Sequence, residues 1–158
     1  MEDYYKPPKA NLVSDTGFSI SPDTKLFKTS GVGVATFFGS LLAGGIIIGL
    51  NYLRMNEQVK ARNTIVFSFL AFAVFMGAVW FLPESIPGMV YTIVQVVIMM
   101  QIARQFQEGK IKHHIENGGR LASNWAAFGI SILVLILVVA IFLLVVFVLE
   151  TYFPDVFI

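Results

Sequence analysis

Four long apolar stretches separated by polar segments dominate the pattern of hydrophobic and polar positions along the chain. They cover about residues 32–53, 64–82, 88–103 and 126–149, and none of them contains a charged residue or a histidine. A helix rises about 1.5 Å per residue and a hydrocarbon core is about 30 Å thick, so about twenty apolar residues can cross it. The pattern therefore predicts an all-α, polytopic integral membrane protein with four transmembrane helices in two hairpins.

Polar tails flank the membrane domain, which is expected over residues 31–150. The N-terminal tail, residues 1–30, is expected to be flexible, and residues 151–158 form a short C-terminal tail. Between the third and fourth stretches, apolar residues recur at four-residue spacing, in the pairs Ile102 with Phe106 and Ile111 with Ile115. This spacing predicts an amphipathic helix lying in the membrane interface, which the pair Gly118–Gly119 should end.

Small residues at four-residue spacing distinguish the first stretch from the other three. The rows continue into a GxxxG pair, and their members are Ala35, Thr36, Gly39, Ser40, Ala43, Gly44, Gly45 and Gly49. Small side chains let helix backbones approach closely, and this packing drives helix association in lipid. We therefore expect this helix to be the hub of the bundle, docked on the third helix through Thr36 and Ser40. The remaining small residues favour a homo-oligomer.

The third stretch is the most polar of the four, with Tyr91, Thr92 and Gln95 close together. Together with Thr36 and Ser40, these groups could line a pore for a facilitator or channel. Hydrogen bonding between helices is the simpler interpretation, and it is the one that the residues favour.

Composition narrows the function classes. The chain is 56% hydrophobic and 13% charged, has a net charge of +1 and contains no cysteine. These values give no sign of a nucleic-acid surface, and they exclude disulfides and cysteine-ligated metals. Membrane transporters that couple to protons usually carry an ionisable residue within a span, and none is present. We therefore predict a protein that is not an enzyme, with no catalytic residue, cofactor or metal site.

Basic residues predict the orientation. The two connections between the first and second and between the third and fourth stretches hold the residues that we expect to contact lipid headgroups or a soluble partner: Arg54, Lys60, Arg62, Lys110, Lys112, His113, His114 and Arg120. The positive-inside rule places these connections in the cytoplasm. With four crossings both termini would then lie outside, although Lys6, Lys9, Lys25 and Lys28 oppose that assignment.

Several short motifs resemble those of a known group of proteins. They are a Tyr-x-Pro-Pro-x-Ala type of tail at Tyr5–Ala10, the run Phe38–Gly44 in the first stretch, and Gly118–Gly119 followed by Ser123-Asn124-Trp125. This combination is similar to a family of uncharacterised four-span proteins of bacterial inner membranes. The resemblance implies a bacterial origin and four spans, and it transfers no activity, cofactor or site residue.

Taken together, these features predict a non-enzymatic bacterial inner-membrane protein that acts as a helix-packing or binding subunit of a membrane assembly. Its expected partners are membrane lipids and further copies or subunits, and not nucleic acid. Two alternatives stay open: the facilitator or channel described above, and an immunity or regulatory protein that binds a membrane-acting partner.

Overall fold

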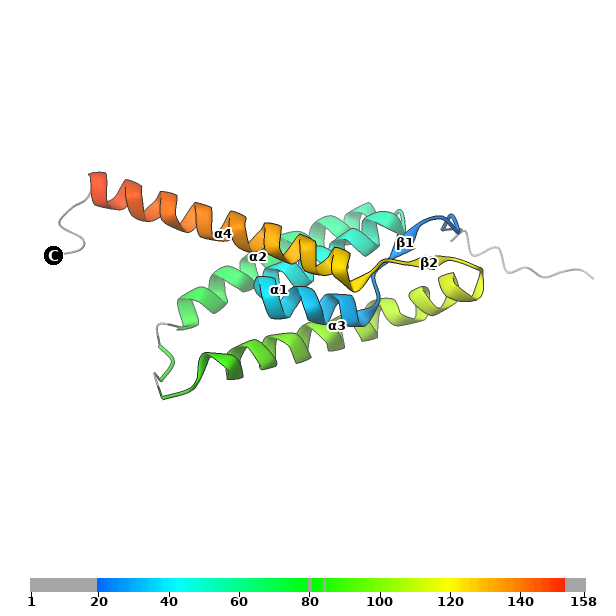
Figure 1. Cartoon of the computed structure of the whole chain (residues 1–158), viewed down its shortest axis with the longest axis horizontal. Coiled ribbons are helices and arrows are strands. Elements are labelled where there is room, and N and C mark those ends of the chain that lie inside the picture. The colour runs from blue at the N-terminus through cyan, green and yellow to red at the C-terminus, as the bar shows by residue number, and fades with distance from the viewer. Residues whose placement is uncertain (1–19, 80, 84, 153–158) are drawn as a thin grey trace, which may run out of the picture.

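Four long helices make up almost the whole of the structure, a computed structural model that describes residues 20–79, 81–83 and 85–152. They are α1 (Thr29–Arg54), α2 (Gln58–Val79), α3 (Gly88–Glu116) and α4 (Asn124–Tyr152), and two-residue strands precede α1 and α4: β1 (Lys25–Leu26) and β2 (Arg120–Leu121) (Figure 1). Each helix is long and apolar enough to cross a membrane, which confirms the predicted all-α class with four candidate spans. Most of the two predicted polar tails, residues 1–19 with the Tyr-Pro-Pro motif and residues 153–158, falls outside the described residues.

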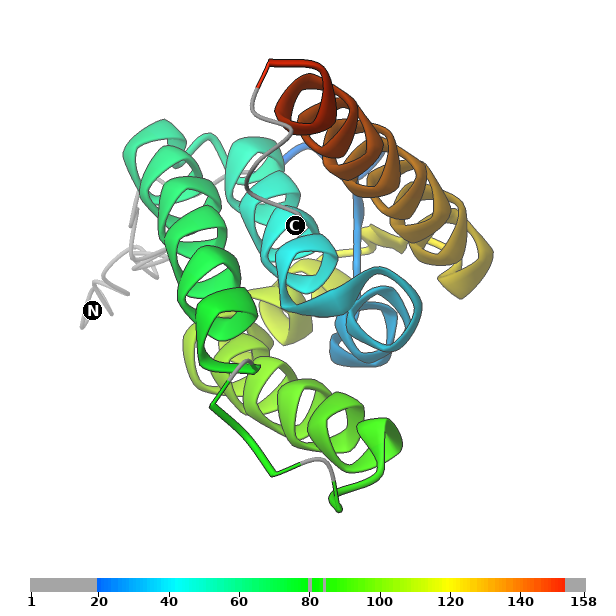
Figure 2. The ribbon, with the colours of Figure 1, turned by 90° about the vertical axis from the view of Figure 1, so that its left-hand side faces the viewer.

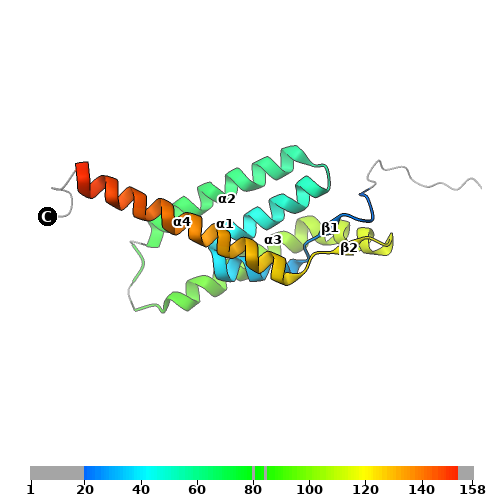
Figure 3. The ribbon, with the colours of Figure 1, turned by 45° about the horizontal axis from the view of Figure 1, so that its top comes forward.

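The helix α1 is broken near its middle. Gly39 and Ser40 leave the helical conformation, and Ser40 has a φ of 67° and a ψ of 179°. A residue with a Cβ rarely adopts this conformation, which costs about 1–3 kcal/mol unless the surroundings enforce it. At the break the chain reverses direction, so the two halves of α1 form a V (Figure 3). The halves pack on one another, because a Cβ placed on Gly44 would overlap the hydroxyl of Thr36.

Both ends of α1 lie at the same end of the molecule, beside β1 and β2 (Figure 1). We call this the basic end. The side chain of Asn51, near the end of α1, hydrogen-bonds the backbone of Phe27, which precedes α1. At about 1.5 Å per residue, the halves 29–38 and 41–54 are about 15 Å and 21 Å long, less than a hydrocarbon core of about 30 Å. Folded in this way, α1 turns back near the middle of the molecule, whereas α2, α3 and α4 continue past that level (Figure 1).

This reversal corrects the expectation that Lys25 and Lys28 lie across the membrane from the basic connections. Strand β1 pairs in parallel with β2, with Lys25 opposite Arg120 and Leu26 opposite Leu121. The guanidinium of Arg54 also donates to the carbonyl of Lys25. The segment before α1 and the connections after α1 and α3 therefore share the basic end. The expectation that these lysines lie at the opposite end was wrong because it took α1 as one straight helix, whereas Gly39 and Ser40 break it.

The other three helices surround α1, which is the most buried of the four (Figure 2). Its glycines make the closest approaches: a Cβ on Gly45 would overlap Ser68 of α2, one on Gly33 would lie 2.8 Å from Met100 Sδ of α3, and one on Gly39 would lie 2.8 Å from the Ser131 carbonyl of α4. Gly49 similarly faces Ile65 of α2. Small residues on α1 thus allow three neighbours to pack against one helix.

The helix α3 is longer than expected. It continues without interruption to Glu116, so the segment predicted as a separate interfacial helix is its last part. Nothing between 104 and 115 stops a helix, since Gly109 weakens it by only about 1 kcal/mol. The helix ends at Glu116 with Asn117 as its C-cap, and Gly118 follows with a φ of 79°, a left-handed conformation that glycine adopts without strain.

Candidate functional site

A cavity of about 250 Å³ lies at the break in α1, and all four helices contribute to its wall. The helix α1 supplies the five consecutive residues 36–40, and the other helices supply Phe72, Thr92, Gln95, Leu135 and Val138. Gly39 and Ser40, the two residues of the break, are among those that line the cavity. We call it the central cavity.

Gln95 of α3 hydrogen-bonds one of the backbone groups that the break in α1 leaves without a helical partner. Its Oε1 accepts a hydrogen bond of 3.0 Å from the Leu41 N–H, a donor freed by the break, and Gln95 itself is only 9% exposed. Ser40 Oγ accepts a weaker bond of 3.4 Å from the Leu42 N–H. Since Oε1 faces the backbone donor, the carboxamide NH₂ of Gln95 points elsewhere, and no hydrogen bond to a described residue engages it. It is a free donor on the cavity wall.

The rest of the wall limits what the central cavity can bind. Phe37, Phe38 and Phe72 give it an aromatic portion, and Leu135 and Val138 an aliphatic one. Among the described residues that line it, none carries a charge, and only Thr36, Ser40, Thr92 and Gln95 have side chains with hydrogen-bonding groups. Ligand sites of this type combine apolar walls with a few polar groups that fix orientation. The arrangement suits a small, uncharged molecule with both an apolar and a hydrogen-bonding part.

The polar residues singled out in the sequence largely converge here. Four of the five line the central cavity, and Tyr91 does not. The Tyr91 hydroxyl is buried and has no hydrogen-bond partner among the described residues. The helix α1 packs on α3 as expected, but the Thr36 hydroxyl donates to the carbonyl of Val32, one turn earlier in α1, and not to a group of α3.

The small residues of α1 are used within the chain. Ala35, Thr36, Gly39, Ala43, Gly44, Gly45 and Gly49 are buried against the neighbouring helices or the other half of α1, and Ser40 is partly buried at the break. These positions therefore no longer argue for a second copy of the chain.

A buried amide pair holds the two ends of α1 together. Asn51 Oδ1 accepts from the Phe27 N–H and Asn51 Nδ2 donates to the Phe27 carbonyl, both at 2.8 Å. Asn51 Nδ2 also donates to Gln107 Oε1 at 3.0 Å, and Gln107 Nε2 donates to the Ile48 carbonyl at 2.9 Å. Asn51 and Gln107 are both fully buried. We call these contacts the amide clamp.

Sequence reasoning missed the amide clamp. It assigned no role to Asn51 or to Gln107. A signal was present for Gln107, which lies four residues from both Ala103 and Ile111 and therefore on one helix face with them. Both of those neighbours are buried.

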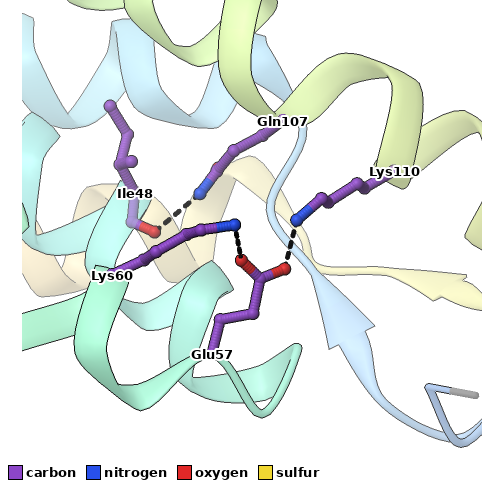
Figure 4. A network of polar contacts seen from close by, with 5 residues as sticks. All are labelled: Ile48, Glu57, Lys60, Gln107 and Lys110. Atoms are coloured by element: carbon purple, nitrogen blue, oxygen red, sulfur yellow. Dashed lines mark hydrogen bonds and ion pairs between the residues drawn. The ribbon is translucent and has the colours of Figure 1, made fainter. Parts of the chain in front are cut away.

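Glu57 lies between α1 and α2 and joins two lysines at the basic end (Figure 4). Its carboxylate pairs with Lys60 at 2.6 Å and with Lys110 of α3. Burial acts to raise the pKa of the Glu57 carboxyl, but hydrogen bonds and positive charges from Lys110 and Lys60 outweigh it and bring that pKa below 4.5. Glu57 is thus ionised at neutral pH, and the cluster carries one net positive charge.

The residues predicted to contact headgroups divide into two groups. Most are exposed at the basic end: Arg54, Lys60, Arg62, Lys112, His113 and Arg120, with Lys110 partly exposed. For His114 the prediction was wrong, because its side chain is 3% exposed and its Nε2 lies 2.8 Å from the Thr24 carbonyl. It is held there because Gly119 packs directly on the imidazole, where a Cβ would overlap the ring.

Within the described part of the chain, no group of three or more histidine, aspartate or glutamate side chains is placed to hold a metal ion. In comparisons with known proteins, no family model, no curated protein and no solved structure matches the chain.

Proposed function

We propose that this is a non-enzymatic membrane protein that binds a small, uncharged solute in the central cavity and facilitates its passage. The observation that carries the proposal is the break in α1 at that cavity. Irregular backbone at membrane depth is tolerated where it is buried in protein or lines a cavity, and discontinuous helices form the binding sites of many transporters. Gln95 and Ser40 would supply hydrogen bonds, and Phe37, Phe38 and Phe72 would pack on the apolar part of the solute.

The size of the site limits the solute further. Drug-sized ligands occupy pockets of about 300–1,000 Å³, so a cavity of about 250 Å³ suits a smaller molecule. None of the described residues on the wall is ionisable, so none of them could couple passage to a proton. The proposal is therefore facilitated movement down a gradient.

Flux into vesicles tests this function. We expect protein-containing liposomes to take up small neutral solutes such as urea or glycerol faster than empty liposomes. Replacing Gln95 with leucine should lower the rate about tenfold, which corresponds to the loss of one buried hydrogen bond of about 1.4 kcal/mol. Thr92→Phe, which fills the cavity and leaves the Gln95–Leu41 hydrogen bond in place, should lower it as well.

Gln101→Leu is the matched control, because Gln101 lies on the same helix, is exposed and does not line the cavity. Uptake no faster than in empty liposomes would overturn the facilitator. Equal rates for the Gln95, Thr92 and Gln101 variants would mean that the solute does not pass through the central cavity.

We further propose that the basic end faces the cytoplasm of a bacterial inner membrane. Every lysine and arginine that the structure describes lies on the β1–β2 side of the break in α1: Lys25, Lys28, Arg54, Lys60, Arg62, Arg104, Lys110, Lys112 and Arg120. The positive-inside rule then has no opposing lysines near the membrane. In this orientation the described N-terminal segment is cytoplasmic, and α4 ends on the outer side.

Single-cysteine labelling tests the orientation in a chain that has no cysteine of its own. Ser21→Cys places a thiol before β1, and Ser85→Cys places one between α2 and α3 at the opposite end. In intact spheroplasts, a membrane-impermeant maleimide should label the Ser85 variant and reach the Ser21 variant only after lysis. Labelling of both variants before lysis would mean that α1 crosses the membrane.

The role as a binding subunit of a membrane assembly and the immunity or regulatory role stay predictions. Because the small residues of α1 are occupied within the chain, assembly would have to use another surface. The far half of α4 is the most apolar surface available, with side chains such as Phe142, Leu144 and Phe147 more than half exposed.

A further inference from the structure

A second and larger cavity, of about 790 Å³, forms a groove between α2 and α3 with the second half of α1 as its floor. Lys60, Asn63 and Lys110 line one end of the groove, while Leu41, Ala71 and Met99 line the other. We propose that this groove binds one anionic phospholipid, with an acyl chain lying in the groove and the phosphate at Lys60 and Lys110.

The length of the groove matches one leaflet. From Lys60 to Ala71 along α2 the rise is about 16 Å at about 1.5 Å per residue, which is about half of a hydrocarbon core of about 30 Å. The lysine end is at the basic end of the molecule, and the other end is level with the break in α1, because Leu41 and Gln95 meet there. A phospholipid has the same extent, with its phosphate at the interface and its chain reaching the bilayer centre.

The lining of the groove changes from charged to apolar along its length, as a phospholipid does from its headgroup to its acyl chains. Beyond the lysine end, apart from Thr64 and Ser68, the lining is apolar, formed by residues of α3 such as Ile98 and Ile102 and by residues of α2 such as Phe67. Phe67 and Phe106, on the two facing helices, are 71% and 58% exposed and flank the opening. The groove thus opens sideways to the bilayer, where an acyl chain can enter without crossing water.

Charge favours an anionic headgroup. Lys60 and Lys110 share one carboxylate, Glu57, which leaves one net positive charge at the mouth of the groove (Figure 4). The Lys60 side chain is 61% exposed and its ammonium has three donors, of which the Glu57 pair uses one. It can donate to a phosphate oxygen while that pair stays in place. A lipid with a net negative charge is therefore preferred to a zwitterionic one.

Electron paramagnetic resonance of spin-labelled lipids tests the proposal on the full chain in bilayers. The probes are phosphatidylglycerol and phosphatidylcholine that carry the same nitroxide near the end of one chain, and the readout is the fraction of each that is motionally restricted. We expect a larger restricted fraction for phosphatidylglycerol. Replacing Lys60 with glutamine should reduce the preference about fivefold, the factor that one basic residue contributes at an anionic lipid surface.

Two further variants separate the groove from the general surface charge. Ala71→Phe fills the inner end and should reduce the restricted fraction of both lipids. Lys112→Gln is the matched control, because Lys112 is an exposed lysine of the same end that pairs with Glu108 outside the groove. It should leave the preference as in the unmodified protein.

Equal restriction of the two lipids in the unmodified protein would overturn the proposal, as would equal effects of Lys60→Gln and Lys112→Gln. An unchanged restricted fraction in Ala71→Phe would also overturn it. The outcome does not depend on the proposed transport function, since lipid restriction is measured without solute flux.

Discussion

Replacing Asn51 with leucine should lower the free energy of unfolding by at least about 3 kcal/mol. Among single substitutions that keep the size of the side chain, we expect this one to have the largest effect. The substitution leaves the Phe27 N–H, the Phe27 carbonyl and Gln107 Oε1 without their partner in a buried site. Each buried group that loses its hydrogen bond costs about 1–3 kcal/mol. The midpoint of unfolding by sodium dodecyl sulfate, from mixed micelles, measures the change.

Asn63→Leu provides the comparison, because Asn63 is exposed on α2 and its side chain makes no hydrogen bond to a described residue. If the Asn51 variant unfolded at the same midpoint as the Asn63 variant, the amide clamp would not hold the ends of α1 together. A loss of stability in Asn51→Leu should also bring faster proteolysis of the segment around Phe27, since that segment is attached to α1 by the clamp.

Gly45→Ala is expected to cost about 2 kcal/mol, within the range for overpacking a tight interior contact. The added Cβ would overlap both Oγ and Cβ of Ser68. The hydroxyl can rotate away, but Ser68 Cβ is attached to the backbone, so α1 and α2 have to separate. The shift of the same unfolding midpoint measures the cost.

A compensating substitution makes this prediction specific. Ser68→Gly removes the atoms that the new methyl group meets, so the double variant should recover most of the stability, with a coupling between the two sites of about 1 kcal/mol or more. Gly77→Ala on α2 is the control, because a Cβ there meets nothing within 4 Å. If the effects at positions 45 and 68 were additive, the loss of stability in Gly45→Ala would not arise from the contact with Ser68.

Hydropathy predicted the four helices because the preference of a stretch for lipid over water depends only on its own side chains. Each apolar stretch is recognisable from its own residues, whatever it packs against. The small residues of the first stretch likewise indicated the hub, since close backbone approach requires them wherever the neighbours lie. Four of the residues that line the central cavity were also singled out from the sequence, because hydroxyl and amide side chains are easily recognised within an apolar stretch.

The reversal of α1 was not predictable from the same information. Residues 29–54 contain no proline, and their length and hydropathy are those of a crossing helix. Two tertiary contacts favour the folded-back form: Gln95 caps the broken helix at Leu41, 54 residues away, and Asn51 bonds Phe27, 24 residues away. Composition and periodicity carry no information on such pairs.

That single reversal brings both ends of α1 together and places the residues of the break on the wall of the central cavity. The sequence alone determined the helices, the apolar faces and the supply of small and polar residues, because these depend on local solvation and helix periodicity. The tertiary structure determined where the first helix ends relative to its start, because the backbone groups freed by a break need polar partners, and here Gln95 of α3 is one of them. From that follow the common end for the basic residues, the central cavity at the break and the leaflet-deep groove beside it.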